Sequence, residues 1–468
     1  MKMSKFALTA MIACACYAGT AFGQTNRTAP RYYPASYYSY YQDGAQAPAP
    51  IASASDAKAA SSAGCDKNSA CDVADICNGK GSSCDSLASC GCGNGACDGG
   101  CGGGLLGLGL LGGGCKLGDP WKLAPNKIAG FNVGGWTSVG YHDHTTNYNF
   151  NNYDGRVQLG QQWLFAEKVA NGSEGLGFGG RIDYVYGTDA PDTQAFGINT
   201  NPNHFDNPWD NGGAYGHALP QLYGEAAVGD LSVKVGRFFT IIGQEVVGAT
   251  GNFFYSRQFM FYNAEPFTHT GALTTYNVDA DTQLYNGYVM GWDSGFDDNG
   301  DAYIGGVKKK LNDTFTFLYA TVQGRFGSQN TSDERGSIHM AMLTAKLSEK
   351  LTYICHNDVL YTTNGAGTVQ RNTFGTVNYL IYKVNDCVSI GNRFEWFNFG
   401  GAFFTDVNGF QRKNDDNFNY TAGINYKVNA NLMLRPEARW VWDRQRFGFN
   451  ENFASSQVAC GGDMVFTF

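Results

Sequence analysis

The sequence ends in Met464-Val465-Phe466-Thr467-Phe468, and this stretch decides the predicted fold. Successive side chains of an extended strand point to opposite faces, so Met464, Phe466 and Phe468 share one face. An alternating strand that finishes on an aromatic residue resembles the assembly signal of bacterial outer-membrane β-barrels. The stretch therefore predicts the last strand of such a barrel, with these three residues as its assembly signal.

Alternation of the same kind recurs through most of the chain. Extended runs of roughly 8–14 residues are separated by clusters of Gly, Asn and Asp. Arg181 and Asp183 share one face of such a run, whereas Ile182 lies on the other. Residues 391–396 and 434–442 repeat the pattern, with charged side chains on one face and aromatic side chains on the other. Period-2 alternation predicts β-strands with two different faces.

Two architectures produce strands with one apolar and one polar face. In a soluble sandwich the apolar face meets a core, whereas in a membrane barrel it meets lipid and the polar face lines the lumen. Aromatic residues near strand ends, such as Trp136, Trp163 and Trp440, favour the membrane, because amphipathic rings prefer the headgroup level. The predicted fold is therefore all-β, a transmembrane antiparallel up-and-down barrel.

Composition excludes several other classes of protein. The chain of 468 residues carries a formal net charge of −8, which makes nucleic acid a poor partner. Charged residues make up 16%, against about 25% in a typical soluble domain, and aromatic residues reach 14%. No run of about 18 apolar residues occurs, so the sequence contains no candidate transmembrane helix.

The number of strands follows from the length of the predicted barrel. Residues 120–468 number 349 (468 − 119), and a membrane strand with its connection takes roughly 20–24 residues. Because bacterial single-chain barrels have even strand numbers, we expect about 16 strands, with 14 as the alternative. Short connections are predicted at 348–350 and 428–430. Long polar loops are expected outside the barrel, at residues 187–219, 247–281 and 293–301.

The N-terminal residues are predicted to be an export signal followed by a linker. Lys2 and Lys5 precede a short apolar region, and Ala21-Phe22-Gly23 offers a cleavage site, so residues 1–23 fit a secretory signal peptide. Residues 24–63 are rich in Tyr, Ala, Ser and Pro without apolar periodicity, which predicts a disordered linker. Export through this signal would lead to the bacterial outer membrane.

A Cys/Gly-rich segment, residues 64–119, joins this linker to the barrel. It holds nine of the 14 cysteines. In an exported chain such a cluster favours disulfides, whereas the spacing lacks the paired Cys-x2-Cys pattern of a metal site. Intermolecular bridges to an envelope partner are the third interpretation. Because nine is odd, at least one thiol must pair outside the cluster or stay free. The disulfide candidates are Cys65, Cys71, Cys77, Cys84, Cys90, Cys92, Cys97, Cys101 and Cys115.

Several segments between about residue 128 and the C-terminus resemble the OmpL-like β-barrel porin family. The segments that carry this resemblance are Gly135-Trp136-Thr137-Ser138-Val139-Gly140-Tyr141, residues 177–187, residues 234–245, Tyr255-Ser256-Arg257, Pro266-Phe267-Thr268-His269-Thr270-Gly271 and Gly291-Trp292-Asp293. The resemblance implies an outer-membrane porin-like barrel and assigns no substrate. It does not extend to the Cys/Gly-rich segment.

Candidate catalytic and cofactor sites are not found. The sequence contains no Gly-x-Ser-x-Gly elbow, P-loop, His-Glu-x-x-His or Rossmann fingerprint, so we expect neither an enzyme nor a bound cofactor. His142 and His144 are separated by two positions, which fits a pair at the barrel rim better than a metal site. His269 is expected to make a hydrogen bond that folds a loop.

The predicted function is passive diffusion of small polar solutes or ions through a water-filled lumen. The alternative is a plugged structural or adhesive barrel that anchors the Cys-rich segment. Expected partners are membrane lipid, the barrel assembly machinery through the last strand, further copies of the chain and an envelope partner of the Cys-rich segment. The candidate pore-lining residues are Arg181, Asp183, Glu225, Lys234, Arg393, Glu395, Arg435, Glu437 and Arg439.

Overall fold

The computed structural model describes residues 115–151, 153–195, 206, 214–296, 300–327, 333–405 and 411–468. These residues belong to one of two compact units into which the chain divides; the second unit, residues 46–112, lies outside them. The predicted signal peptide, the linker and the eight cysteines from Cys65 to Cys101 also lie outside the described residues.

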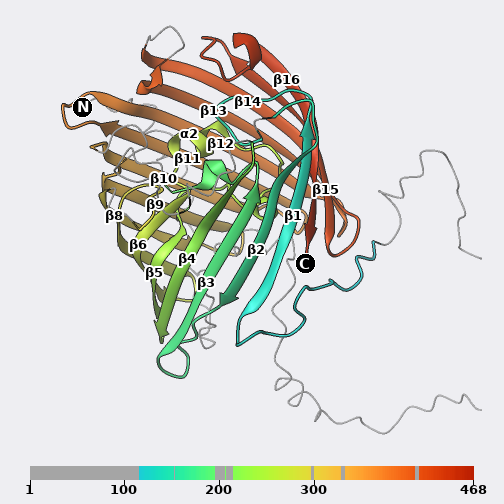
Figure 1. The fold of residues 1–468 in the computed structure, drawn as a ribbon, viewed down its shortest axis with the longest axis vertical. Coiled ribbons are helices and arrows are strands. Elements are labelled where there is room, and N and C mark those ends of the chain that lie inside the picture. The colour runs from blue at the N-terminus through green and yellow to red at the C-terminus, as the bar shows by residue number, and fades with distance from the viewer. Residues whose placement is uncertain are drawn as a thin grey trace, which may run out of the picture. The chain divides into compact units, whose positions relative to one another are not determined.

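Sixteen antiparallel strands form one closed barrel (Figure 1), which confirms the predicted architecture and strand number. Each strand pairs with its neighbours in sequence, and β1 pairs with β16 to close the ring. The strands are β1 (Asn132–His142), β2 (Gln158–Lys168), β3 (Gly177–Gly187), β4 (Gly216–Val228), β5 (Leu231–Phe239), β6 (Thr268–Asp279), β7 (Thr282–Val289), β8 (Asp301–Lys310), β9 (Phe315–Arg325), β10 (Arg335–Lys346), β11 (Leu351–Thr363), β12 (Val369–Lys383), β13 (Val388–Thr405), β14 (Gln411–Lys427), β15 (Leu432–Asp443) and β16 (Ser456–Thr467).

The terminal stretch takes the predicted place in the closing strand. β16 pairs with β1 from Trp136 opposite Thr467 to His142 opposite Gly461. Beyond the strand, Gly135 and Phe468 exchange backbone hydrogen bonds of 2.9 and 3.0 Å. Closure satisfies the backbone groups that a free sheet edge would expose, which is a requirement inside a bilayer.

The two faces of the strands are assigned by pairing, because directly opposite residues point to the same side of a sheet. Arg393 pairs with Thr421, and Thr421 pairs with Arg439, so one buried face continues across β13, β14 and β15. Ile182 and Phe394 alternate with this buried set and are exposed on the outer surface. The alternation predicted from the sequence is therefore confirmed, with the polar set inside.

Short and long connections segregate to opposite ends of the barrel. The predicted short turns join β10 to β11 and β14 to β15. Both chain ends of the barrel, before β1 and after β16, lie at this short-turn end, because β16 runs antiparallel to β15 from the loop end. Short turns mark the periplasmic end of an outer-membrane barrel.

The prediction of a long outer loop at residues 247–281 is wrong. Residues 240–267, here called the inserted segment, connect β5 to β6 and are largely buried, and β6 already begins at Thr268. The inserted segment contains a 3-10 turn (η5, Ala249–Gly251) and the short helix α2 (Phe259–Ala264), which lies within the ring of strands in Figure 1. Its two runs of large apolar residues explain the burial, because water disfavours such a surface. These runs are Phe253-Phe254-Tyr255 and Phe259-Met260-Phe261.

Two other predicted outer loops also differ in detail. The connection after β3 contains a 3-10 turn (η3, Pro191–Thr193), and β4 begins at Gly216, inside the range predicted as loop. Asp293 is buried rather than solvated, and its carboxylate accepts the backbone N–H groups of Phe267 and Thr268 at 2.7 Å each.

Among the described residues, no helix is long and apolar enough to cross a bilayer.

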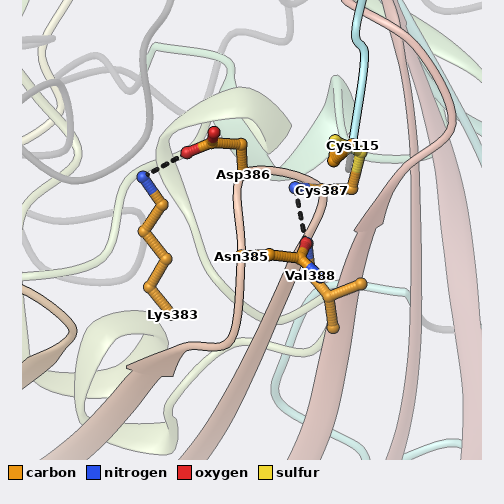
Figure 2. Close-up of a disulfide and its surroundings, with 6 residues drawn as sticks. All are labelled: Cys115, Lys383, Asn385, Asp386, Cys387 and Val388. Atoms are coloured by element: carbon orange, nitrogen blue, oxygen red, sulfur yellow. Dashed lines mark hydrogen bonds and ion pairs between the residues drawn. A yellow bond between two sulfur atoms is a disulfide. The ribbon is translucent and has the colours of Figure 1, made fainter. Parts of the chain in front are cut away.

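A disulfide fastens the chain at the short-turn end of the barrel (Figure 2). Cys115 pairs with Cys387 in the turn between β12 and β13, with 5.8 Å between their Cα atoms. Asn385 accepts the N–H groups of Cys387 and Val388 and so shapes this turn. The cluster cysteine Cys115 therefore pairs outside the cluster, with a partner 272 residues away.

The residues that follow Cys115 run along the ends of neighbouring strands. The Ala430 N–H donates to the Leu117 carbonyl at 2.9 Å in the turn between β14 and β15. Trp121 donates its N–H to Asn431 at 2.7 Å, and its ring stacks on Phe466 with 6.2 Å between centroids. Residues 115–121 thus connect the β12–β13 turn to the end of the closing strand.

Candidate functional site

The candidate site is the barrel interior, where the inserted segment meets strands from all around the ring. Gln161 of β2 donates to the Val247 carbonyl at 2.7 Å. On other strands, Tyr379 of β12 donates to Glu245 at 2.7 Å, and Glu395 of β13 accepts from α2. A segment that contacts β2, β12 and β13 at once crosses the lumen rather than covering its outside.

Two charged residues of β13 hold the beginning of α2 and the segment before it. Glu395 accepts the N–H groups of Phe259 at 3.0 Å and Met260 at 2.7 Å, and it also accepts the Asn419 amide. Arg393 forms an ion pair of 2.5 Å with Glu245 and donates to the Ser256 carbonyl at 2.9 Å. Both strand residues are completely buried, so they hold the inserted segment rather than face an open pore.

The charged residues of β15 hold the middle of the inserted segment. Glu437 accepts the N–H groups of Tyr255 at 2.8 Å and Ser256 at 3.1 Å. Arg435 donates through Nη1 to the Ala249 and Asn252 carbonyls at 2.8 and 2.6 Å, and its Nε and Nη2 donate to Asp463 of β16 at 2.7 and 2.6 Å. Backbone groups of an irregular segment that are buried from water need such partners.

Arg439 lies further along β15 and contacts the helix of the inserted segment. Its guanidinium carbon lies 4.5 Å from the centre of the Phe259 ring, and one nitrogen lies 3.4 Å from the Thr146 hydroxyl. The side chain is 2% exposed. A cation over an aromatic face is attracted by the ring quadrupole, which adds to the attachment of α2.

The predicted lining residues on β3, β4 and β5 are arranged differently. Arg181 pairs with Asp183 on the same strand at 2.6 Å and with Glu167 of β2 at 3.1 Å. Glu225 and Lys234 occupy directly opposite positions on β4 and β5. Arg181 and Asp183 also contact neighbouring wall residues, since Gln221 of β4 donates to Asp183, and Lys234 lies over the ring of Tyr223 on β4.

The wall formed by β7 to β10 was not anticipated from the sequence. Most of its inward positions away from the short-turn end are apolar, and they pack in one cluster with Phe254, Phe259 and Met260 of the inserted segment. The apolar residues of the segment therefore face an apolar part of the wall. The inward residues of that wall in the cluster are Tyr285, Val289, Ala302, Ile304, Leu318, Ala320, Val322, Ile338, Met340 and Met342.

The histidines considered in the sequence have separate surroundings. His142 ends β1, is buried and lies 3.6 Å from Glu437, whereas His144 follows the strand and lies 3.1 Å from Glu451. They share no site. His269 contacts the Gly291 carbonyl at 2.8 Å and the Thr240 hydroxyl at 3.1 Å, which confirms a hydrogen-bonding role at the base of the inserted segment.

Comparison with known proteins identifies the family. The family described as "Putative beta-barrel porin-2, OmpL-like" matches residues 130–468. The chain belongs to this family. The chain is accordingly a barrel of the bacterial outer membrane, and the family resemblance predicted from short segments is confirmed. No curated protein matches its sequence.

Several solved structures of outer-membrane proteins are similar to this chain. OmpT of Vibrio cholerae has a TM-score of 0.49 and 11% identity, covering 73% of this chain and 99% of its own. An anion-selective porin from Comamonas acidovorans has a TM-score of 0.48 and 10% identity, covering 72% and 99%. The outer-membrane channel DcaP of Acinetobacter baumannii has a TM-score of 0.47 and 10% identity, covering 74% and 100%.

Proposed function

We propose that this barrel is a porin-like channel for passive diffusion of small polar solutes or ions. The observation that carries the proposal is the placement of the inserted segment inside the ring of strands. Its polar groups are bound to β2, β12, β13 and β15, and its apolar groups pack against β7–β10 and against β1–β4, whereas Arg181 and Asp183 of β3 are bonded to each other. A segment held in the lumen narrows a pore and sets its width, and charges left along the remaining wall set its selectivity.

The proposed route follows the inward residues that keep partial exposure. Lys234 of β5, Gln283 of β7 and Lys308 of β8 are half-buried on the inner face near the short-turn end. Glu167 keeps 18% of its side chain exposed on the inner face of β2. Charges in a narrow aqueous pore are less screened than charges on an open surface, so these residues would act on passing ions.

Planar-bilayer recording tests this proposal. Purified protein should produce stepwise increases in conductance, and a salt gradient should give a non-zero reversal potential that reports ion preference. The channel proposal would be contradicted if the protein is folded, as verified by heat-modifiable mobility in gels, and inserts into the bilayer but never conducts.

A plugged barrel that anchors the Cys-rich segment is the second candidate, and the Cys115–Cys387 disulfide favours it. The bond fixes the end of that segment to the short-turn end of the barrel, which is the place where an anchor for an envelope component would be needed. Replacing Cys115 by Ser should leave conductance unchanged if the protein is a channel. Under the anchor hypothesis the change would instead release the segment from outer-membrane fractions after protease treatment.

A further inference from the structure

Three buried side chains with metal-binding groups meet between the inserted segment and the wall. Glu265 follows α2 directly, and His356 and Asp358 are separated by two positions on the inner face of β11. One ligand atom from each of the three lies within 4.8 Å of the other two. All three residues are at most 2% exposed, so water does not readily replace a missing partner.

Glu265 differs from the other acidic residues that surround the inserted segment. Glu245, Glu395 and Glu437 each accept hydrogen bonds from backbone N–H groups. By contrast, neither carboxylate oxygen of Glu265 has a hydrogen-bond partner, although both are buried. Asp358 also keeps one buried oxygen without a partner, and its other oxygen accepts the His356 ring N–H at 2.9 Å.

Two buried carboxyl groups this close together are compensated either by a shared proton or by a positive charge nearby. The imidazole Nε2 of His356 lies 2.9 Å from Asp358 and 3.9 Å from Glu265, and no Arg or Lys ion pair involves either carboxylate in the described part of the chain. Metal–ligand bonds of about 2.0–2.2 Å place neighbouring donor atoms of a zinc site roughly 3.0–3.5 Å apart. The observed distances bracket this range, so small side-chain rotations suffice for a shared ion.

We propose that Glu265, His356 and Asp358 bind a divalent first-row transition cation, with Zn²⁺ as the test ion, inside the barrel. One nitrogen and two oxygen donors suit such an ion better than Mg²⁺ or Ca²⁺, which prefer oxygen alone. The ion would join the end of α2 to β11, a wall strand to which the segment has few other polar attachments. The proposal concerns how the segment is fastened and is independent of whether the lumen conducts.

Metal content of the purified full-length protein is the primary test. Thiols are first blocked with iodoacetamide, because any free cysteine thiolate is itself a zinc ligand. After dialysis against Zn²⁺, one tightly held equivalent per chain is expected in the wild type. Glu265→Gln and Asp358→Asn should each lower zinc affinity at least tenfold, whereas Glu451→Gln, a carboxylate outside the cluster, should not.

Co²⁺ substitution and thermal unfolding supply a second readout. The wild type should bind Co²⁺ with visible ligand-field bands and without a thiolate charge-transfer band, and Zn²⁺ should raise its unfolding temperature. The proposal would be overturned if the wild-type barrel folds, as shown by heat-modifiable mobility, and yet binds no more metal than Glu265→Gln. The proposal would also be overturned if Glu265→Gln unfolds at the same temperature as zinc-treated wild type. A proton shared by the two carboxyl groups of the wild type would then explain why they lie together.

Discussion

The charged residues of β13–β15 and those of β3–β5 face the same lumen but serve different structural roles. Arg393, Glu395 and Glu437 bond to backbone atoms or side chains of the inserted segment. Arg181 and Asp183 bond to each other and to neighbours on the wall. Identical alternation in the sequence therefore produced two kinds of site, and the difference lies in what packs against each wall.

The largest expected effect comes from breaking an attachment on β13. Glu395→Ala removes the acceptor of two backbone N–H groups and leaves Arg393 with fewer counter-charges, which should cost about 3–5 kcal/mol. The freed segment should become accessible to trypsin at Arg257, which is 2% exposed in the intact barrel. Limited proteolysis and unfolding in urea measure the two effects.

The matched control is on the opposite wall. Glu167→Ala also removes an inward carboxylate, yet Arg181 keeps its partner Asp183. The barrel should resist trypsin at Arg257 as the wild type does. Equal cleavage of the two variants would show that the inserted segment does not depend on β13.

The next effect separates the inner face from the outer face of one strand. Phe394 is adjacent to Glu395 but exposed on the outside of β13. Phe394→Arg should cost roughly 2–4 kcal/mol near the bilayer midplane and hinder assembly. Folding yield into lipid vesicles, with Phe394→Leu as control, measures this. Protection of Arg257 should persist in the molecules that fold; normal insertion of the arginine variant would contradict the lipid-facing assignment.

A smaller effect is expected from replacing the ion pair of β3 as a whole. Arg181→Met with Asp183→Leu substitutes apolar groups for a buried pair, which is often neutral by itself, but it also removes a partner from Glu167 and an acceptor from Gln221, so a loss of about 1–2 kcal/mol is expected. Replacing Arg393 and Glu395 together by apolar residues should lower the free energy of unfolding much more, since it leaves backbone N–H groups without acceptors. Measuring the free energy of unfolding of the two double variants compares the two walls directly. Similar losses would contradict the claim that the charges of β13 and those of β3 have different structural roles.

The smallest effect on stability should accompany a change in ion preference. Lys234 is half-buried opposite Glu225, so Lys234→Gln should shift permeation toward cations and change stability by about 1 kcal/mol or less. Lys309→Gln on the outer face of β8 is the control, because its side chain is directed away from the lumen. Reversal potentials in a salt gradient distinguish them; identical values for both variants would remove Lys234 from the conducting path.

Much of the barrel could be predicted because strand alternation is a local property. The faces of Arg181, Asp183 and Ile182 follow from a period of two, and the strand number follows from length divided by the residues per strand. All nine predicted lining residues occupy inward positions by register. Their role in a pore stays a prediction.

Whether residues 240–267 enter the lumen was decided by tertiary structure. Glu395 and Glu437 lie 136 and 181–182 residues from the backbone groups that they hold, and no local pattern encodes such a pairing. The same applies to Cys115, because an odd count requires one cysteine to leave the cluster or stay free but cannot select Cys387. Sequence by itself determined which side of β3, β13 and β15 faces inward, because charged and apolar residues alternate along these strands. Closure of the ring determined which distant strands share a lumen, and therefore which charges hold the inserted segment and which remain with their own wall.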